Sequence, residues 1–290
     1  MFWKGRRQSD NYEDRGSGGG RRIASIGGFG TLIVVLIVWL MGGNPMEVLQ
    51  NLQTGAPVEQ QSGDVKKSPH EEELVQFSRV VLADTEDVWN KLFKESNQTY
   101  REPTLVTFSN SVESACGLTS VATGPFYCPG DEKLYIDLVF FEDLQSKIGA
   151  SGDFVIAYVI AHEVGHHVQK LLGTMDKFSN MREKLSQKEF NRLNVKLELQ
   201  ADFYAGVWAH HAQKMKNMME QGDLEEAMNA ASAIGDDRLQ KQSQGRVVPD
   251  SFTHGTSKQR MRWFKLGFDS GDISKGDTFN AEELNRKLPS

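Results

Sequence analysis

The sequence is short of cysteine and has no excess of positive charge. Its 290 residues include two cysteines, Cys116 and Cys128, and carry a net charge of −6. Two cysteines with distant histidines do not match a structural zinc finger. The two thiols either form one disulfide in an oxidising compartment or stay free in the cytosol. The acidic balance, with no basic patch interleaved with aromatic residues, predicts no binding to nucleic acid.

Long uncharged apolar runs are also scarce, and only residues 23–41 form one. These 19 residues are rich in Ile, Val and Leu and are long enough to span a bilayer. Residues 1–22 hold six basic and three acidic residues with little apolar content, which predicts a disordered, cytoplasmic, basic tail. We therefore expect a single-pass inner-membrane protein that contacts the lipid bilayer through residues 23–41. The part of the chain after residue 41 would be periplasmic or extracellular, where a disulfide is favoured over free thiols.

The rest of the chain predicts one linker and one domain. Residues 42–69 carry Pro, Gly, Gln and Ser without periodicity, as is typical of a flexible linker. Residues 70–290 are enough for one sizeable domain. Its patterns predict helices over residues 71–93 (in two segments broken near residues 83–84), 153–172, 187–213, 223–235 and 257–266. They also predict a strand over residues 104–108 and a hairpin over residues 126–138. The expected fold class is α+β, mainly helical, with a small sheet and one preceding transmembrane helix.

The most informative pattern is His-Glu-Val-Gly-His at residues 162–166, inside the apolar helix predicted over residues 153–172. Residues i and i+4 share one helix face, so His162 and His166 can point ring nitrogens at one metal ion. Glu163 lies about 100° around the helix, where its carboxylate reaches a metal-bound water without being a ligand. Gly165 costs helix stability and indicates close packing or room for a neighbour near the metal.

Catalytic zinc usually takes three protein ligands. The longer signature that adds a third histidine on the same stretch is excluded, because Gln169 and Leu172 occupy the positions it requires. A glutamate on a later helix remains, and Glu198 is the candidate. Asp202, one turn further on, would accept the other ring N–H of a ligand histidine. The alternative is that Glu198 and Asp202 are a solvated acidic face.

The flanking sequences carry a family resemblance. His-Glu-Val-Gly-His-His-Val-Gln, Gly-Pro-Phe-Tyr-Cys-Pro-Gly upstream and Glu-Leu-Gln-Ala-Asp-Phe-Tyr-Ala-Gly downstream resemble the bacterial putative neutral zinc metallopeptidase family (YpfJ-like). The arrangement is similar to zincins whose third zinc ligand is a glutamate. The resemblance covers about residue 70 to the C-terminus and the N-terminal anchor. It implies a zincin-like metallopeptidase domain with Zn2+ as cofactor and a peptide or protein substrate.

The resemblance also implies roles outside the metal ligands. In related glutamate zincins a downstream His or Arg stabilises the oxyanion, which points to His254 or Arg260, with Tyr204 as a further candidate. The alternative is that His254 and Arg260 brace their loop. One strand of the hairpin over residues 126–138 would pair with an extended substrate, or be a plain structural hairpin. His167 is expected either in the core or next to the metal ligands, and His210 and His211 on the helix surface.

These patterns together predict a membrane-anchored zinc metalloendopeptidase. His162, His166 and Glu198 would hold zinc, and Glu163 would act as general base. Two alternatives stay open. One is a non-catalytic, membrane-tethered binding module on a zincin scaffold, which the intact Glu163 disfavours. The other is a zinc amidohydrolase that acts on a non-peptide substrate.

Overall fold

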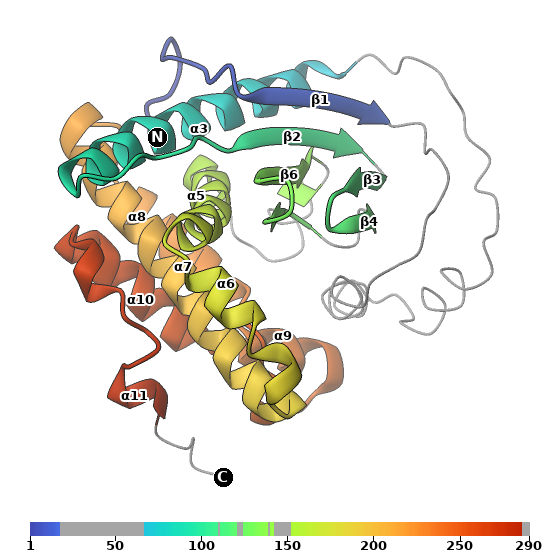
Figure 1. Cartoon of the computed structure of the whole chain (residues 1–290). Coiled ribbons are helices and arrows are strands. Elements are labelled where there is room, and N and C mark those ends of the chain that lie inside the picture. Colours follow the sequence, from blue (N-terminus) through green and yellow to red (C-terminus); the bar gives the residue numbers. More distant parts are fainter. Residues whose placement is uncertain (18–66, 110, 121–123, 139, 142–151, 286–290) are drawn as a thin grey trace.

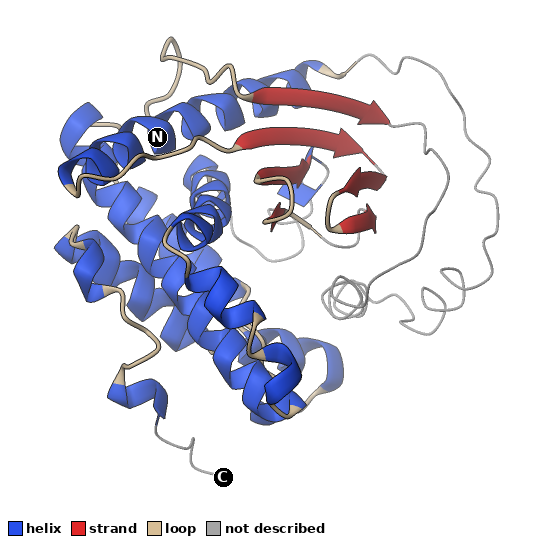
Figure 2. Cartoon of the chain, viewed as in Figure 1, coloured by secondary structure: helices blue, strands red, loops and turns tan. Residues whose placement is uncertain are grey.

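The computed structural model describes residues 1–17, 67–109, 111–120, 124–138, 140–141 and 152–285. Helices gather on one side and strands on the other (Figure 2). The strands are β1 (Tyr12–Ser17), β2 (Thr104–Ser109), β3 (Ser111–Ser114), β4 (Gly117–Ser120), β5 (Phe126–Cys128) and β6 (Lys133–Asp137). The longer helices are α3 (Pro69–Glu95), α5 (Asp153–Leu171), α7 (Gln187–Lys216), α8 (Asp223–Ala233), α9 (Asp236–Gln244) and α10 (Ser257–Ser270). Short helices are α6 (Thr174–Ser179), η2 (Arg182–Lys184), η3 (Pro249–Ser251), η4 (Ile273–Lys275) and α11 (Glu282–Asn285). The mainly helical α+β part of the predicted fold class is confirmed.

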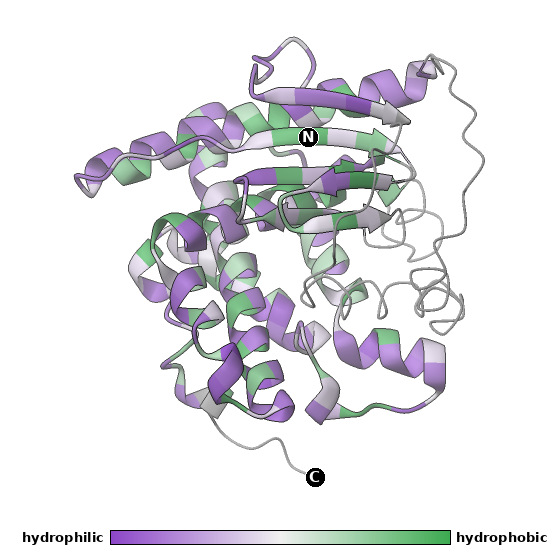
Figure 3. Ribbon diagram, turned by 45° about the vertical axis from the view of Figure 1, so that its right-hand side comes forward, coloured by the Kyte–Doolittle hydropathy of each residue, from purple (hydrophilic) through white to green (hydrophobic). Residues whose placement is uncertain are grey.

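The main sheet has the strand order β1-β2-β6-β5, in which β1, β2 and β6 are parallel and β5 is antiparallel to β6. Strands β3 and β4 form a separate hairpin. Strand β2 is mostly apolar and β1, at the sheet edge, is mostly polar (Figure 3). This contrast fits a central strand covered on both faces beside a solvated edge strand.

Helix α5 is the centre of the helical layer, where it packs against α3, α7 and α8 (Figure 1). Every residue from Phe154 to Gln169 is buried. A helix that is apolar on all sides needs such an environment, because it has no polar face to present to water. The polar side chains of the predicted motif are therefore held inside the domain, where their positions are fixed by packing.

Two glycine contacts set the distances between α5 and α7 and between α7 and α10. A Cβ on Gly165 of α5 would lie 2.8 Å from the carbonyl oxygen of Ala201 in α7. On the other side of α7, a Cβ on Gly206 would lie 2.0 Å from the carbonyl oxygen of Phe264 in α10. Real side chains do not fit at such distances, so these helices touch backbone to backbone. The expectation that Gly165 indicates close packing is confirmed.

The N-terminal segment, residues 1–17, belongs to the folded domain. Strand β1 pairs with β2 in parallel, and the backbone N–H of Phe2 donates to the carbonyl oxygen of Met218 at 2.7 Å. Arg6 bonds to Asp84, and Arg7 Nη1 lies 2.9 Å from Glu86. The structure thus differs from the prediction of a disordered tail for residues 1–17, and residues 18–22 lie outside the described ranges. Composition alone could not predict that this segment is folded, because its basic side chains have their acidic partners on α3, far away in sequence.

Helix α3 also differs from its prediction, because it is continuous rather than broken near residues 83–84. Asp84 and Glu86 are 1% and 2% exposed within it. Arg6 and Lys216 pair with Asp84, while Arg7 and Ser9 bond to Glu86. Distant parts of the chain neutralise the buried carboxylates of Asp84 and Glu86, so the helix continues through them.

The predicted fold class needs one correction. No helix in the described part of the chain is both long and apolar enough to cross a membrane. The transmembrane helix predicted over residues 23–41 is therefore not supported, and those residues lie outside the described ranges. The predicted linker over residues 42–69 also lies largely outside them. The prediction rested on the apolar composition of residues 23–41 alone, and no helix of the described residues has such a composition over a sufficient length.

Candidate metal centre

Two neighbouring helices supply the polar side chains of the site. Helix α5 carries His162, Glu163 and His166, and helix α7 carries Glu198 and Asp202. The serine N-cap of α7 forms a capping box with Glu189, which fixes where this helix begins. Because α5 and α7 meet at Gly165, their facing side chains are brought within contact distance.

The three predicted ligands converge. His162 Nε2 lies 3.2 Å from Glu198 Oε2, and His166 Nε2 lies 3.6 Å from the same oxygen. One donor atom from each residue lies within 4.8 Å of the others. Ligand atoms about 2.0–2.1 Å from a zinc ion at tetrahedral angles are about 3.3 Å apart. The two nitrogens and the carboxylate oxygen thus have the chemistry and spacing of three corners of a zinc site.

Asp202 orients the first ligand histidine. Its Oδ1 lies 2.8 Å from His162 Nδ1, on the side of the ring away from Glu198. An ionised carboxylate accepts, so Nδ1 carries the proton and the Nε2 lone pair is left for a metal. Burial would raise the pKa of Asp202, but Arg260 and His162 lower it to about 2. Asp202 is fully buried and paired, which excludes the solvated acidic face as its role.

Gln169 orients the second ligand histidine, a role that the sequence analysis missed. Its Oε1 lies 2.9 Å from His166 Nδ1, and its Nε2 donates to the carbonyl oxygen of Leu197 at 2.7 Å. Gln169 therefore links His166 to the backbone next to Glu198. Its spacing of three residues from His166, on the same helix face, is the signal that could have revealed it.

Glu163 is placed differently from the other carboxylates. Glu163 is 8% exposed and therefore almost completely buried. Among the residues that the structure describes, no hydrogen bond or salt bridge occupies its carboxylate. A carboxylate beside a metal site without a protein partner is available to a water molecule or a substrate, as a general base must be.

His254 lies near the metal ligands and is held by Asp236. Asp236 Oδ2 accepts the backbone N–H groups of Thr253, His254 and Gly255 at 2.8, 2.6 and 2.9 Å. Asp236 Oδ1 is 3.4 Å from His254 Nδ1. Burial lowers the pKa of His254, but Asp236 and the nearby Glu198 raise it above its usual value. The histidine is thus both held in place and biased toward its cation.

The side chains of Arg260 and Tyr204 are buried and pack against Asp202 and Trp89 respectively. Arg260 is 2% exposed and contacts Asp202 from behind the His162 ring. Tyr204 is 4% exposed and packs edge-on against Trp89, with ring centroids 5.7 Å apart. Neither placement matches the oxyanion contact that the resemblance implied. Both residues fall on helix faces turned toward other helices.

Three other histidines form hydrogen bonds that stabilise the fold. His167 is fully buried, as predicted, with Nε2 2.6 Å from the carbonyl oxygen of Arg101 and Nδ1 3.0 Å from the hydroxyl of Tyr127. The carbonyl requires the proton on Nε2, so Nδ1 accepts from Tyr127. His210 and His211 are partly buried and bond to the carbonyl oxygens of Phe268 and Gly271. They join α7 to the end of α10.

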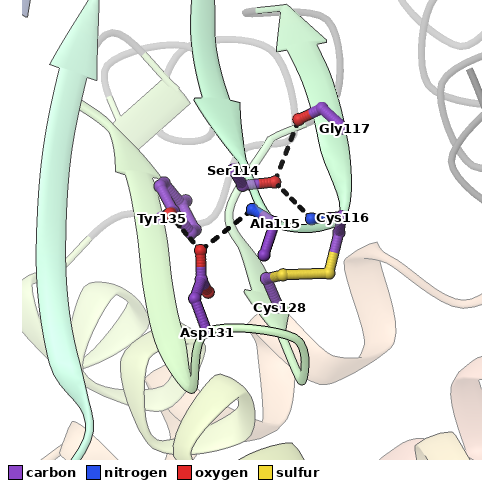
Figure 4. The surroundings of a disulfide bond; sticks show 7 residues. All are labelled: Ser114, Ala115, Cys116, Gly117, Cys128, Asp131 and Tyr135. Carbon is purple, nitrogen blue, oxygen red and sulfur yellow. Dashed lines mark hydrogen bonds between the residues drawn. A yellow bond between two sulfur atoms is a disulfide. The ribbon is translucent and has the colours of Figure 1, made fainter. Parts of the chain in front are cut away.

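Cys116 and Cys128 form a disulfide, which ties the β3–β4 turn to strand β5 (Figure 4). Asp131 strengthens this connection, because its Oδ2 accepts the backbone N–H of Ala115 and the hydroxyl of Tyr135. Strand β5 also packs against α5, through Tyr127 and His167. The predicted hairpin β5–β6 is therefore braced from both sides at the strand nearest the motif helix.

A second acidic group, Asp153, Asp223 and Glu226, could also gather around a cation. It contains no histidine, and the Met1 nitrogen already lies 2.6 Å from Asp153. Its hard oxygen donors suit zinc less well than the two imidazoles of the first group. The His162, His166 and Glu198 group is the better zinc site.

Comparisons with known proteins agree with this geometry. A model of the family described as "Putative neutral zinc metallopeptidase" matches residues 1–279. The chain is 52% identical over 285 residues to the uncharacterized protein YpfJ of Escherichia coli (strain K12), covering 96% of this chain and 99% of that protein. It is 41% identical over 195 residues to the uncharacterized protein Mb2605 of Mycobacterium bovis, covering 64% of this chain and 65% of that protein. No solved structure matches the chain significantly.

Proposed function

This chain belongs to the putative neutral zinc metallopeptidase family, and from that premise we propose that it hydrolyses peptide bonds with zinc as cofactor. The family implies zinc, and His162, His166 and Glu198 fit it in donor type and spacing. The observation that carries the proposal is the pairing of this three-ligand group with Glu163, a neighbouring carboxylate that has no hydrogen-bond or salt-bridge partner among the described residues. A metal site kept only for stability would close its fourth position and would need no base.

When bound, zinc supplies a Lewis acid that lowers the pKa of water toward neutrality. In our proposal Glu163 accepts the proton of the attacking water as the water oxygen bonds to the peptide carbonyl carbon. Glu163 then delivers this proton to the amide nitrogen. The C–N bond breaks and leaves a carboxylic acid and an amine. The second proton of the water then passes from the acid to the amine, which gives a carboxylate and an ammonium group without another reactant.

His254 is the residue that we assign to the oxyanion. Its imidazole lies close enough to Glu198 for each to shift the pKa of the other. The Asp236 carboxylate holds both its backbone and its ring, as a pre-organised donor requires. Arg260 and Tyr204 are not assigned this role, because their side chains are directed toward Asp202 and Trp89.

The position of strand β5 suggests where a substrate would bind. It is the edge strand of the main sheet that packs on α5, and edge strands accept an extended peptide by main-chain hydrogen bonding. The disulfide and Asp131 hold this strand in place. We therefore propose that a peptide substrate lies along β5, with its scissile bond over the metal centre.

The test combines metal analysis with a peptide-library cleavage assay on the full chain. The proposal expects about one zinc per chain, and cleavage that is lost together with zinc in Glu198→Ala. Zinc bound without cleavage of any peptide would contradict peptidase activity and favour the binding-module or amidohydrolase alternatives. The exposed Glu183→Ala is the matched control, because it removes a glutamate outside the site.

A further inference from the structure

Asp202 joins three helices at one carboxylate. It accepts hydrogen bonds from His162 and Tyr158 of α5 and from Arg260 of α10, while lying itself on α7. Asp202 and Arg260 are 0% and 2% exposed. A buried ion pair of this kind costs desolvation energy, and its replacement by apolar groups is often neutral for stability. Stability alone is therefore a weak reason for the pair, and its position directly behind a metal ligand suggests another role.

We propose that Arg260 is a positioning residue of the metal centre, which acts through Asp202 to hold the His162 ring in the orientation and tautomer that zinc requires. The proposal rests on the zinc site of the proposed function. It assigns to Arg260 a role in metal binding rather than contact with the substrate. Arg260 Nη2 is 3.5 Å from His162 Nδ1, the nitrogen that faces away from Glu198.

The hydrogen-bond geometry shows how a guanidinium can do this. Arg260 Nε donates to Asp202 Oδ2 at 2.8 Å, and Nη2 donates to Oδ1 at 2.9 Å. Two parallel bonds fix the plane of the carboxylate, which a single bond would leave free to rotate. With that plane fixed, Oδ1 stays 2.8 Å from His162 Nδ1. The ring is thereby held with Nε2 toward Glu198.

The other donors of Arg260 fix the guanidinium in turn. Nη1 donates to the carbonyl oxygen of Ile234 at 3.3 Å, and Nη2 also reaches the hydroxyl of Tyr158 at 3.2 Å. Lysine has one ammonium group and cannot make a planar fork to a carboxylate while also meeting these acceptors. The site therefore requires arginine in shape as well as in charge.

The helix that carries Arg260 is fixed against α7 by backbone contact. A Cβ on Gly267 of α10 would lie 2.1 Å from the carbonyl oxygen of Phe203, and a Cβ on Gly206 of α7 would meet Phe264. These contacts begin at Phe203, the residue directly after Asp202, and leave little freedom for α10 to slide. Helix α10 thus becomes part of the metal centre, although none of its residues is a ligand.

A double-mutant cycle on zinc affinity, measured by chelator competition, tests the proposal. Arg260→Met and Asp202→Ala should each weaken zinc binding about 10- to 100-fold, as loss of a histidine's outer hydrogen-bond partner does. In the Asp202→Ala background, Arg260→Met should cause no further loss, because the arginine acts through Asp202. Equal losses in both backgrounds, or unchanged affinity in Arg260→Met, would overturn the proposal. The exposed Lys258→Met, on the same helix, is the matched control.

A further variant covers the case in which Arg260→Met does not fold. Arg260→Lys keeps the charge and loses the fork, so it should weaken zinc binding while the circular dichroism spectrum stays that of the wild type. Wild-type affinity in this variant would show that the fork has no positioning role. If the wild-type chain itself binds no zinc, both this inference and the proposed function fail. Normal zinc binding in every variant rejects the inference alone.

Discussion

The backbone of Gly165 in α5 rests directly on Ala201 in α7. A Cβ at residue 165 would lie 2.8 Å from the Ala201 carbonyl oxygen and 3.0 Å from its Cα. Gly165 stands between Glu163 and His166 of the motif, and Ala201 stands between Glu198 and Asp202. The closest approach of the two helices therefore coincides with the place where their ligands meet.

Gly165→Ala tests this contact. In a free helix the change would stabilise the protein by about 1 kcal/mol, because alanine is the better helix former. Here we expect it to lower the free energy of unfolding by about 1–3 kcal/mol, because the added methyl group forces α5 and α7 apart. Zinc affinity should fall with it. Chemical denaturation and chelator competition measure the two effects, and a stabilised variant would contradict the packing described.

Asp202→Ala should weaken zinc binding about 10- to 100-fold without removing a ligand. The His162 ring would lose its hydrogen-bond partner and its fixed tautomer. Gln169→Ala should have a smaller effect of the same kind on His166, because the amide is a neutral partner. Chelator competition on both variants checks the order. A larger loss in Gln169→Ala than in Asp202→Ala would contradict the role given to the Asp202 charge.

Arg6→Gln tests whether the N-terminal segment is part of the domain. It should lower the free energy of unfolding by about 1–3 kcal/mol, because Lys216 is then the one basic partner left to the buried Asp84 among the described residues. Lys4→Gln should leave stability almost unchanged, since the Lys4 side chain is 77% exposed. Denaturant titration of the full chain measures both. Equal stability of the Arg6 variant and the wild type would show that residues 1–17 are dispensable.

The pH profile of cleavage should report His254. Burial lowers its pKa, and Asp236 and Glu198 raise it to a net value above that of a free histidine. The cation that serves the oxyanion is therefore present below this raised pKa, and activity falls as the pH rises through it. Asp236→Asn removes one of the raising interactions, so the alkaline limb of kcat/KM should move to lower pH. An alkaline limb that does not move in Asp236→Asn would exclude His254 from this role.

Local patterns predicted the elements that hold the site. Helix α7 begins at Gln187 as expected, and α5 ends at Leu171, one residue before the predicted end. Strand β2 and the β5–β6 hairpin lie where their β-branched and aromatic residues predicted them. These features depend on periodicity and on neighbours within a few positions, which the sequence displays directly.

Features that depend on distant partners were missed. Arg6 and Asp84 are separated by 78 residues, and no local pattern reveals that a basic segment neutralises a buried carboxylate. Arg260 and Asp202 are separated by 58 residues, and the family resemblance had suggested an oxyanion contact for Arg260 instead. Asp236 was missed because its partners are backbone N–H groups of a loop. In each case the fold determines which distant group a charged side chain contacts.

Glu163 is the proposed base beside a zinc site, and the proposed activity depends on it more than on any other residue. The most direct measurement compares wild type and Glu163→Gln for zinc content and for peptide cleavage in the same preparations. We predict about one zinc per chain in both proteins, and cleavage by the wild type alone, since the amide cannot take up the proton. Equal cleavage by a zinc-loaded Glu163→Gln protein would contradict the mechanism.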